Sequence, residues 1–139
     1  RRTVDDIVAA LHAQGVHPAP GQFFSEPIYT VTDLLREIAQ VDIVVSSRLH
    51  PIIFGLLLDK PAVSIAYNQK NDSVMRAVGL DAFRHQIDDF DPDLLYQDVL
   101  RIEAQAPSLR AQIHQVVTGF RGDVYEQNKK VFGDTRGVN

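Results

Sequence analysis

The fold of this 139-residue chain is decided by residues 42–67, which read DIVVSSRLHPIIFGLLLDKPAVSIAY. The segment starts and ends with short β-branched apolar runs, residues 42–47 and 62–67, which are typical of strands buried on both faces of a sheet. Between them, Pro51 begins an apolar run to Leu58 that suits a short helix. A strand, a helix and a second strand in this order predict two parallel neighbouring strands joined by a right-handed crossover.

Further helices and one weak strand are expected on both sides of this segment. Before it, helices are predicted from the N-cap Thr3 to a Schellman stop at Gly15, and after Thr30 to about Gln40. After it, a helix capped by Asn71 or Asp72 and a strand over residues 83–87 are expected. Two more helices are expected to follow, one from Asp91 and a last one from Pro107 to about Val131. The helix from Asp91 would direct four apolar side chains inward, those of Leu94, Leu95, Val99 and Ile102. Alternating strands and helices predict an α/β chain, with residues 1–139 as a single Rossmann-like domain whose open parallel sheet is flanked by helices.

Composition excludes several classes of function. A net charge of −4 leaves no general basic surface for nucleic acid, so an anionic ligand would need a local cluster of cations. The chain has no cysteine, which removes thiolate metal ligands and cysteine nucleophiles and fits a reducing compartment. We expect a cytoplasmic location, with peripheral attachment at the inner face of the membrane left open. The acidic cluster at residues 88–93 lacks the glycine and the bidentate glutamate of a calcium loop, so no metal is expected there. No Gly-x-Gly-x-x-Gly or phosphate-loop motif occurs in the sequence, so no organic cofactor is expected either.

Two polar and cationic segments follow the two predicted strands. Residues 46–51 read Ser-Ser-Arg-Leu-His-Pro, and residues 67–72 read Tyr-Asn-Gln-Lys-Asn-Asp. Open parallel sheets bind ligands at the carboxyl ends of their strands, where helix N-termini also attract anions. Arg48 offers a planar fork of donors, His50 can exchange a proton near neutral pH, and Lys70 adds a compact positive charge. These residues predict a site for a small anion with several negative charges.

Structural explanations of the same residues stay open. An arginine at a strand end is commonly part of a surface ion pair, and a single histidine is more often structural than catalytic. The other histidines, at positions 12, 17, 85 and 114, have no partners at ligand spacing and are expected on the surface or on helix faces. With two cations and a histidine on neighbouring loops, the sequence supports a functional site and these structural explanations about equally.

The run from Ile43 to Lys70 resembles the signature stretch of the polysaccharide pyruvyltransferase family. The shared pattern is a buried strand, Arg-Leu-His, a short apolar helix, a proline-led strand and Tyr-x-x-Lys, and the similarity covers residues 31–80 well. The resemblance implies that the chain is the C-terminal half of a two-domain enzyme like the GT-B glycosyltransferases. The active site would then lie in the cleft between two Rossmann-like halves, of which the N-terminal one would be missing from this sequence.

The resemblance also implies a reaction. Family members transfer a pyruvyl group from phosphoenolpyruvate to a pair of sugar hydroxyls and form a ketal on a cell-surface polysaccharide or its lipid-linked precursor. Carried over by position, His50 is the catalytic acid/base residue and Arg48 binds the donor. The other substrate-binding candidates are Ser47, Tyr67, Asn68 and Lys70. The expected partners are therefore phosphoenolpyruvate, a saccharide or lipid-linked saccharide acceptor and the N-terminal half, without nucleic acid, and activity of the isolated chain stays open.

Two other functions remain as alternatives. One is the nucleotide-sugar-binding half of an ordinary GT-B glycosyltransferase, but no acidic residue between Asp42 and Asp59 is present to hold a ribose. The other is a non-catalytic domain of the same fold, although the chain retains Arg48, His50 and Lys70. Tight binding of a nucleoside diphosphate sugar would favour the first alternative, and a ligand screen would separate the second from an enzyme.

Overall fold

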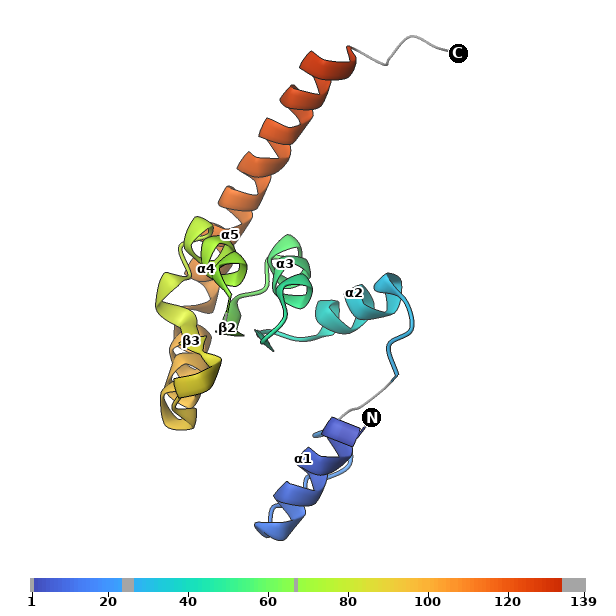
Figure 1. Ribbon diagram of the computed structural model, residues 1–139, viewed down its shortest axis with the longest axis vertical. Coiled ribbons are helices and arrows are strands. Elements are labelled where there is room, and N and C mark those ends of the chain that lie inside the picture. Colours follow the sequence, from blue (N-terminus) through green and yellow to red (C-terminus); the bar gives the residue numbers. More distant parts are fainter. Residues whose placement is uncertain (1, 24–26, 67, 134–139) are drawn as a thin grey trace. The chain divides into compact units, whose positions relative to one another are not determined.

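The computed structural model describes residues 2–23, 27–66 and 68–133 (Figure 1). The chain forms two compact units, Arg1–Val31 and Thr32–Asn139, and the strands found in the described ranges all lie in the second unit. No helix in these ranges is both long enough and apolar enough to cross a membrane.

The first unit contains helix α1 (Arg2–Ala13) and the loop that follows it. The helix ends in the predicted Schellman arrangement, because Gly15 adopts a φ of 77° that favours glycine. The Val16 N–H then donates to the Leu11 carbonyl at 2.9 Å. Thr3 already lies inside the helix, so the expectation that it precedes the helix as N-cap is wrong, since an N-cap keeps a non-helical backbone.

The second unit is built on a parallel sheet in the order β1 (Val44–Ser46), β2 (Ala62–Ala66) and β3 (Arg84–Gln86). β1 pairs with β2 in parallel, with Val44 opposite Ala62, and β2 pairs with β3 in parallel. This topology confirms the predicted α/β class, the parallel pairing of the first two strands and the third strand.

Helices connect and cover these strands (Figure 1). The elements after α1 that are not strands are α2 (Val31–Gln40), α3 (Leu49–Leu57), α4 (Gln69–Ala77), the short 3-10 helices η1 (Asp81–Phe83) and η2 (Ile87–Asp89), and α5 (Pro92–Phe132). α3 joins β1 to β2, and α4 leads from β2 towards β3 through η1. The buried core of the second unit includes Ile38, Ile52, Leu56, Val63, Met75, Leu80, Ile102 and Ile113.

α3 packs closely on β1 at Gly55. A Cβ atom at this position would lie 2.8 Å from Cγ2 of Val44, a distance that real Cβ atoms essentially never show. Ile52 and Leu56, on the same side of the helix, are 0% and 3% exposed. The absent side chain of Gly55 therefore lets the helix approach the strand, and this approach fixes the position at which α3 begins.

The described residues of the second unit cover only one of the two faces of β1. Successive residues of a strand point to opposite faces. Val44 is 7% exposed beneath α3, whereas the next residue, Val45, is 46% exposed. The prediction that the first strand is buried on both faces is therefore wrong, because β1 lies at the edge of a small sheet.

α5 runs without interruption from Pro92 to Phe132, with Asp91 as its N-cap as predicted. The prediction of two separate helices divided at Pro107 is wrong. A proline inside a helix removes one backbone hydrogen bond, but Ile102, Leu109, Ile113 and Val117 are buried at helical spacing on both sides of it. Burial of this continuous apolar face favours one helix over two. Leu94, predicted to point inward, is 52% exposed because it lies before this face begins.

The middle of α5 contacts the loops at the amino ends of the strands. Arg110 pairs with Asp42 just before β1 at 2.9 Å, and His114 lies 2.9 Å from Asp59 in the loop that precedes β2. Gln112 donates through Nε2 to the Val78 carbonyl at the end of α4, at 2.7 Å. These contacts leave the opposite edge of the sheet, at the carboxyl ends of β1 and β2, available for a ligand.

His85 is a structural residue of β3. Its Nε2 lies 2.8 Å from Asp98 Oδ2 on α5, and the two side chains are 10% and 8% exposed. Arg101 also pairs with Asp98, at 3.2 Å. The expectation that His85 lies on the surface is wrong, because a tertiary partner satisfies it in the interior.

The packing at Gly55 predicts the effect of an added methyl group. Gly55→Ala should lower the free energy of unfolding by about 1–3 kcal/mol, because overpacking against Val44 exceeds the gain in helix propensity. Gly119→Ala is the matched control, since Gly119 is also helical and a Cβ there meets nothing within 4 Å. The control should raise the free energy of unfolding by about 0.4–1 kcal/mol. Urea denaturation measures both, and a stabilising Gly55→Ala would contradict the close approach of α3 to β1.

Candidate functional site

The two predicted polar segments begin at the carboxyl ends of neighbouring parallel strands. β1 ends at Ser46 and leads through Arg48, the N-cap residue of α3, into that helix. β2 ends at Ala66 and leads through Asn68, the N-cap residue of α4, into the second helix. Because β1 and β2 are paired in parallel, both loops lie at the same edge of the sheet, where open α/β folds bind ligands.

Ser46 holds the backbone of Arg48. The Arg48 N–H donates to Ser46 Oγ at 3.0 Å, and the same hydroxyl donates to the Arg48 carbonyl at 3.1 Å. Arg48 consequently keeps an extended backbone, with φ −104° and ψ 144°, at the point where α3 begins. Sequence reasoning did not single out Ser46, although a serine near a strand end is a common backbone clamp.

Asn71 links the two loops to each other. Its side chain is fully buried, and Nδ2 donates to the Ser47 carbonyl and to Ser64 Oγ, each at 3.4 Å. The first bond joins α4 to the loop before α3, and the second joins α4 to β2. Asn71 therefore fixes the start of α4 relative to the loop that carries Arg48.

Asn68, and neither Asn71 nor Asp72, caps α4. Its Oδ1 accepts hydrogen bonds from the N–H groups of Lys70 and Asn71, both at 3.1 Å, as an N-cap side chain does for the N2 and N3 positions. The predicted cap lies one helical turn too late in the sequence, because Asn71 is buried within the first turn of α4. With its oxygen occupied, Asn68 retains only its Nδ2 group for a ligand.

The N-terminus of α3 differs from that of α4. No side chain of its N-cap residue, Arg48, bonds to the first turn. The side chain of the N-cap residue therefore occupies neither the Leu49 nor the His50 N–H group, and Pro51 has no N–H group. An uncapped helix start favours an anion through these N–H groups and the helix dipole. Of the two helix starts, α3 is thus the better anion site.

The candidate side chains are accessible. Ser47, Arg48, His50 and Lys70 are exposed and Asn68 is half-buried, whereas Tyr67 lies outside the described residues. The His50 ring lies 6.3 Å from the ring of Phe54, one turn further along α3. The arginine, the imidazole and the ammonium group are therefore each accessible from solvent.

The charge of Arg48 is not neutralised within the described residues. Arg36, Arg76, Arg84, Arg101 and Arg110 each pair with an aspartate. In the described ranges, no carboxylate lies within pairing distance of Arg48, His50 or Lys70. Ion pairs thus account for five of the arginines whose side chains are described, and not for Arg48.

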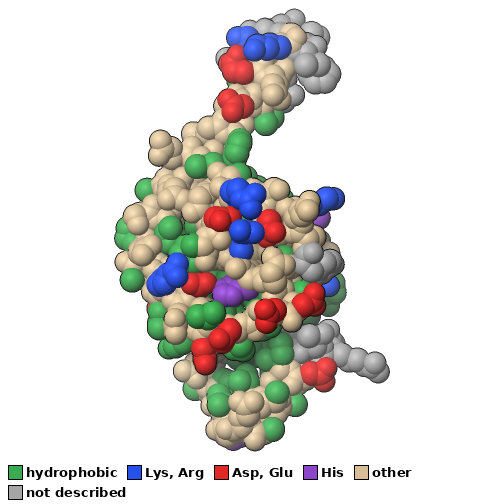
Figure 2. Space-filling model, turned by 60° about the vertical axis from the view of Figure 1, so that its left-hand side comes forward, with side chains coloured by type: hydrophobic (Ala, Val, Ile, Leu, Met, Phe, Trp, Pro, Cys, Tyr) green, Lys and Arg blue, Asp and Glu red, His purple; other side chains and the backbone are tan. Residues whose placement is uncertain are grey.

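One face of the molecule is mixed in sign. Figure 2 shows acidic and basic side chains interspersed on the face in view, without one broad basic patch. The net charge of −4 agrees with this distribution. No group of three or more potential metal-ligating side chains occurs among the residues whose positions are described. Attraction of an anion therefore depends on the local groups at the start of α3 and α4.

Comparison with known proteins gives a family match that spans most of this edge of the sheet. A family model described as polysaccharide pyruvyl transferase matches residues 3–69, a segment that contains Arg48, His50 and both site loops up to the residue before Lys70. Comparison with curated proteins and with solved structures gives no match. The family is a transferase family and implies pyruvyl transfer to polysaccharides in general. The match over residues 3–69 supports the assignment of this segment to the polysaccharide pyruvyl transferase family.

Proposed function

We propose that this chain supplies the donor-binding site of an enzyme that transfers a pyruvyl group from phosphoenolpyruvate to two hydroxyls of one sugar, forming a ketal. The observation that carries the proposal is Arg48, which has no carboxylate partner among the described residues and lies beside His50 at the uncapped start of α3. Both residues lie within the segment that matches the family. The acceptor in this proposal is a saccharide of a cell-surface polysaccharide or its lipid-linked precursor.

The charges of the donor suit the groups at this edge. Phosphoenolpyruvate carries a phosphate and a carboxylate, and a guanidinium can bind either of them through two parallel hydrogen bonds. In our proposal Arg48 binds one of these groups, and the N–H groups of Leu49 and His50 add donors for the same charge. Lys70, from the neighbouring loop, contributes a second positive charge. Two cations on separate loops match two anionic groups on one small molecule.

The reaction requires several proton transfers near the donor. A proton is added to the methylene carbon of the enol, and one sugar hydroxyl attacks C2 and loses its proton. Phosphate then leaves with the electrons of its C–O bond, and the second hydroxyl attacks C2 and loses its proton to close the ketal. His50 is the proposed acid/base residue, because an exposed imidazole can give and take protons near neutral pH. Arg48 stabilises the charge that develops on the departing phosphate.

The remaining candidates complete the proposed substrate site. Ser47 offers an exposed hydroxyl beside Arg48, and Asn68 offers its Nδ2 group. Tyr67 is proposed from the resemblance alone. We further propose that a second Rossmann-like half lies opposite this edge and completes the cleft, in an enzyme located in the cytoplasm. Asn71 then has a positioning role, because it ties the Ser47 backbone to the helix that begins beside Lys70.

The acid/base role of His50 predicts a selective loss of turnover. In the full-length enzyme, His50→Ala should lower kcat by about 10²–10⁴-fold, the usual contribution of a general acid or base. The affinity for phosphoenolpyruvate should change little, because Arg48 and the N–H groups of α3 remain. Pyruvyl transfer to a sugar acceptor measures kcat, with His17→Ala as a control at an exposed histidine of the first unit. Near-normal turnover of His50→Ala would make His50 a structural residue.

The donor-binding role of Arg48 predicts a different pattern. Arg48→Ala should weaken phosphoenolpyruvate binding and also slow transfer, because the guanidinium contacts charge before and during phosphate departure. Arg48→Lys should restore only part of both, since a point charge cannot make the bidentate contact. Arg36→Ala, which removes a surface ion pair on α2, is the matched control. Unchanged donor affinity in Arg48→Ala would contradict the proposed site.

A further inference from the structure

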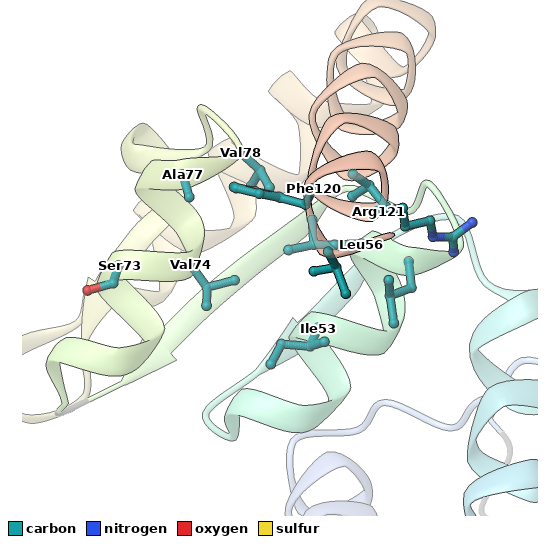
Figure 3. Close-up of a pocket in the computed structure, with 11 residues that line it drawn as sticks. Ile53, Leu56, Ser73, Val74, Ala77, Val78, Phe120 and Arg121 are labelled. Atoms are coloured by element: carbon teal, nitrogen blue, oxygen red, sulfur yellow. The ribbon is translucent and has the colours of Figure 1, made fainter. Parts of the chain in front are cut away.

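Two features outside the candidate anion site are candidates for binding a further ligand. An apolar groove lies between α3, α4 and the C-terminal half of α5, and its lining is apolar except for Ser73 and Arg121 (Figure 3). An apolar lining of this kind does not distinguish one apolar ligand from another. The second feature is a pair of imidazole rings in the first unit, and their nitrogens do favour a particular class of ligand.

The two imidazoles are brought together by the turn that ends α1. They belong to His12, in the last turn of the helix, and to His17, in the loop that follows. Gly15 has a φ of 77°, and the Val16 N–H donates back to the Leu11 carbonyl at 2.9 Å, so the chain reverses its direction here. The two ring centroids lie 4.9 Å apart. A separation of five positions does not predict this approach, because it depends on the turn.

The distance between the rings suits two imidazoles bound to one metal ion. A metal–nitrogen bond of about 2.0–2.1 Å places each ring centroid roughly 3.2 Å from the metal. At bond angles of about 90° and 109°, as in octahedral and tetrahedral coordination, the two centroids are then about 4.5–5.2 Å apart. The observed 4.9 Å lies within this range. The turn therefore holds the two rings at the spacing of a chelate.

Neither imidazole has a competing partner in the part of the chain that the structure describes. The histidines of β3 and of the middle of α5 each pair with an aspartate, at 2.8 and 2.9 Å. In the described ranges, no hydrogen bond or ion pair involves the ring of His12 or His17, and both side chains are exposed. Ion pairing therefore explains the other two histidines but not this pair, whose ring nitrogens are open to solvent.

The surroundings of the pair favour a cation that keeps part of its water shell. The C-terminal end of a helix is the negative end of its dipole and attracts positive charge, and His12 lies in the last turn of α1. Among the described residues, no third histidine, cysteine or carboxylate joins the two rings. Water would fill the other positions of the ion, so its binding is weaker and more exchangeable than at a structural zinc site with four protein ligands.

We propose that His12 and His17 form a two-histidine site for a divalent transition-metal ion such as Zn²⁺, Ni²⁺ or Cu²⁺. Imidazole nitrogen is a preferred ligand of these ions, whereas Mg²⁺ and Ca²⁺ take oxygen ligands. The bound ion joins the loop after α1 to the last turn of the helix and stabilises the reversal at Gly15. Residues of the first unit alone form the site, so the inference does not depend on the proposed function.

Calorimetric titration of the 139-residue chain, without an affinity tag, tests the site with Zn²⁺. One ion should bind to each chain, and Mg²⁺ should not bind at the same concentrations. His12→Gln and His17→Gln should each lower the affinity for Zn²⁺ at least about tenfold, since loss of even an outer-shell partner of a metal commonly costs that much. The double variant should lose little more than either single variant, because one ring alone makes no chelate. His114→Gln, at an exposed histidine of α5, is the matched control and should keep the affinity.

The opposite outcomes overturn the inference. Full affinity in either single variant would show that the two rings do not share an ion. Binding that the double variant retains would place the ion elsewhere in the chain, and an absence of Zn²⁺ binding would leave the two rings as a simple aromatic contact. Proton NMR of the unmodified chain gives a measurement without substitutions. The ring signals of His12 and His17 should reach half-saturation at the same Zn²⁺ concentration, and different concentrations would contradict a shared ion.

Discussion

The close packing of α3 on β1 is the constraint on which the site depends. Because Gly55 has no side chain, α3 lies close to Val44, and its first turn begins at the carboxyl end of the strand. The parallel pairing of β1 and β2 then brings the start of α4 to the same edge. α5 contacts the loops at the amino ends of the strands, so the carboxyl edge stays accessible. The positions of Arg48, His50 and Lys70 follow from this packing.

Hydrogen bonds at the edge make the two helix starts chemically different. Asn68 caps the first turn of α4. The first turn of α3 has no side-chain cap and lies beside Arg48, which has no carboxylate partner in the part of the chain that the structure describes. Asn71 is buried between the two loops, and its Oδ1 has no hydrogen-bond partner among the described residues. An unsatisfied buried acceptor costs about 1–3 kcal/mol. The two bonds of its Nδ2 group, to Ser47 and Ser64, offset part of this cost and hold the loops in register.

Local sequence signals predicted the centre of the fold and the residues at its edge. Short β-branched runs and the intervening apolar helix indicated the parallel pair of strands, and the position of Arg48 after a strand indicated its place at the ligand edge. The predictions from sequence were wrong where the structure depends on tertiary burial. Pro107 indicated a break, but the buried face from Ile102 to Val117 is continuous. Asn71 has the residue type of a helix cap, but it is buried inside α4. The roles of Ser46 and Ser64 depend on contacts that no local sequence pattern specifies.

The most direct test of the account is a titration of the isotope-labelled chain with phosphoenolpyruvate, followed through the chemical shifts of its backbone amides. If the uncapped start of α3 binds the donor, the amides of Leu49 and His50 should shift the most. The amides of Lys70 and Asn71 should shift less, because Asn68 already accepts their hydrogen bonds. Arg48→Ala should reduce the shifts at α3. Shifts confined to other parts of the chain would contradict a donor site at Arg48 and His50. So would an absence of shifts at phosphoenolpyruvate concentrations at which the unmodified enzyme is active and the Arg48→Ala enzyme is impaired.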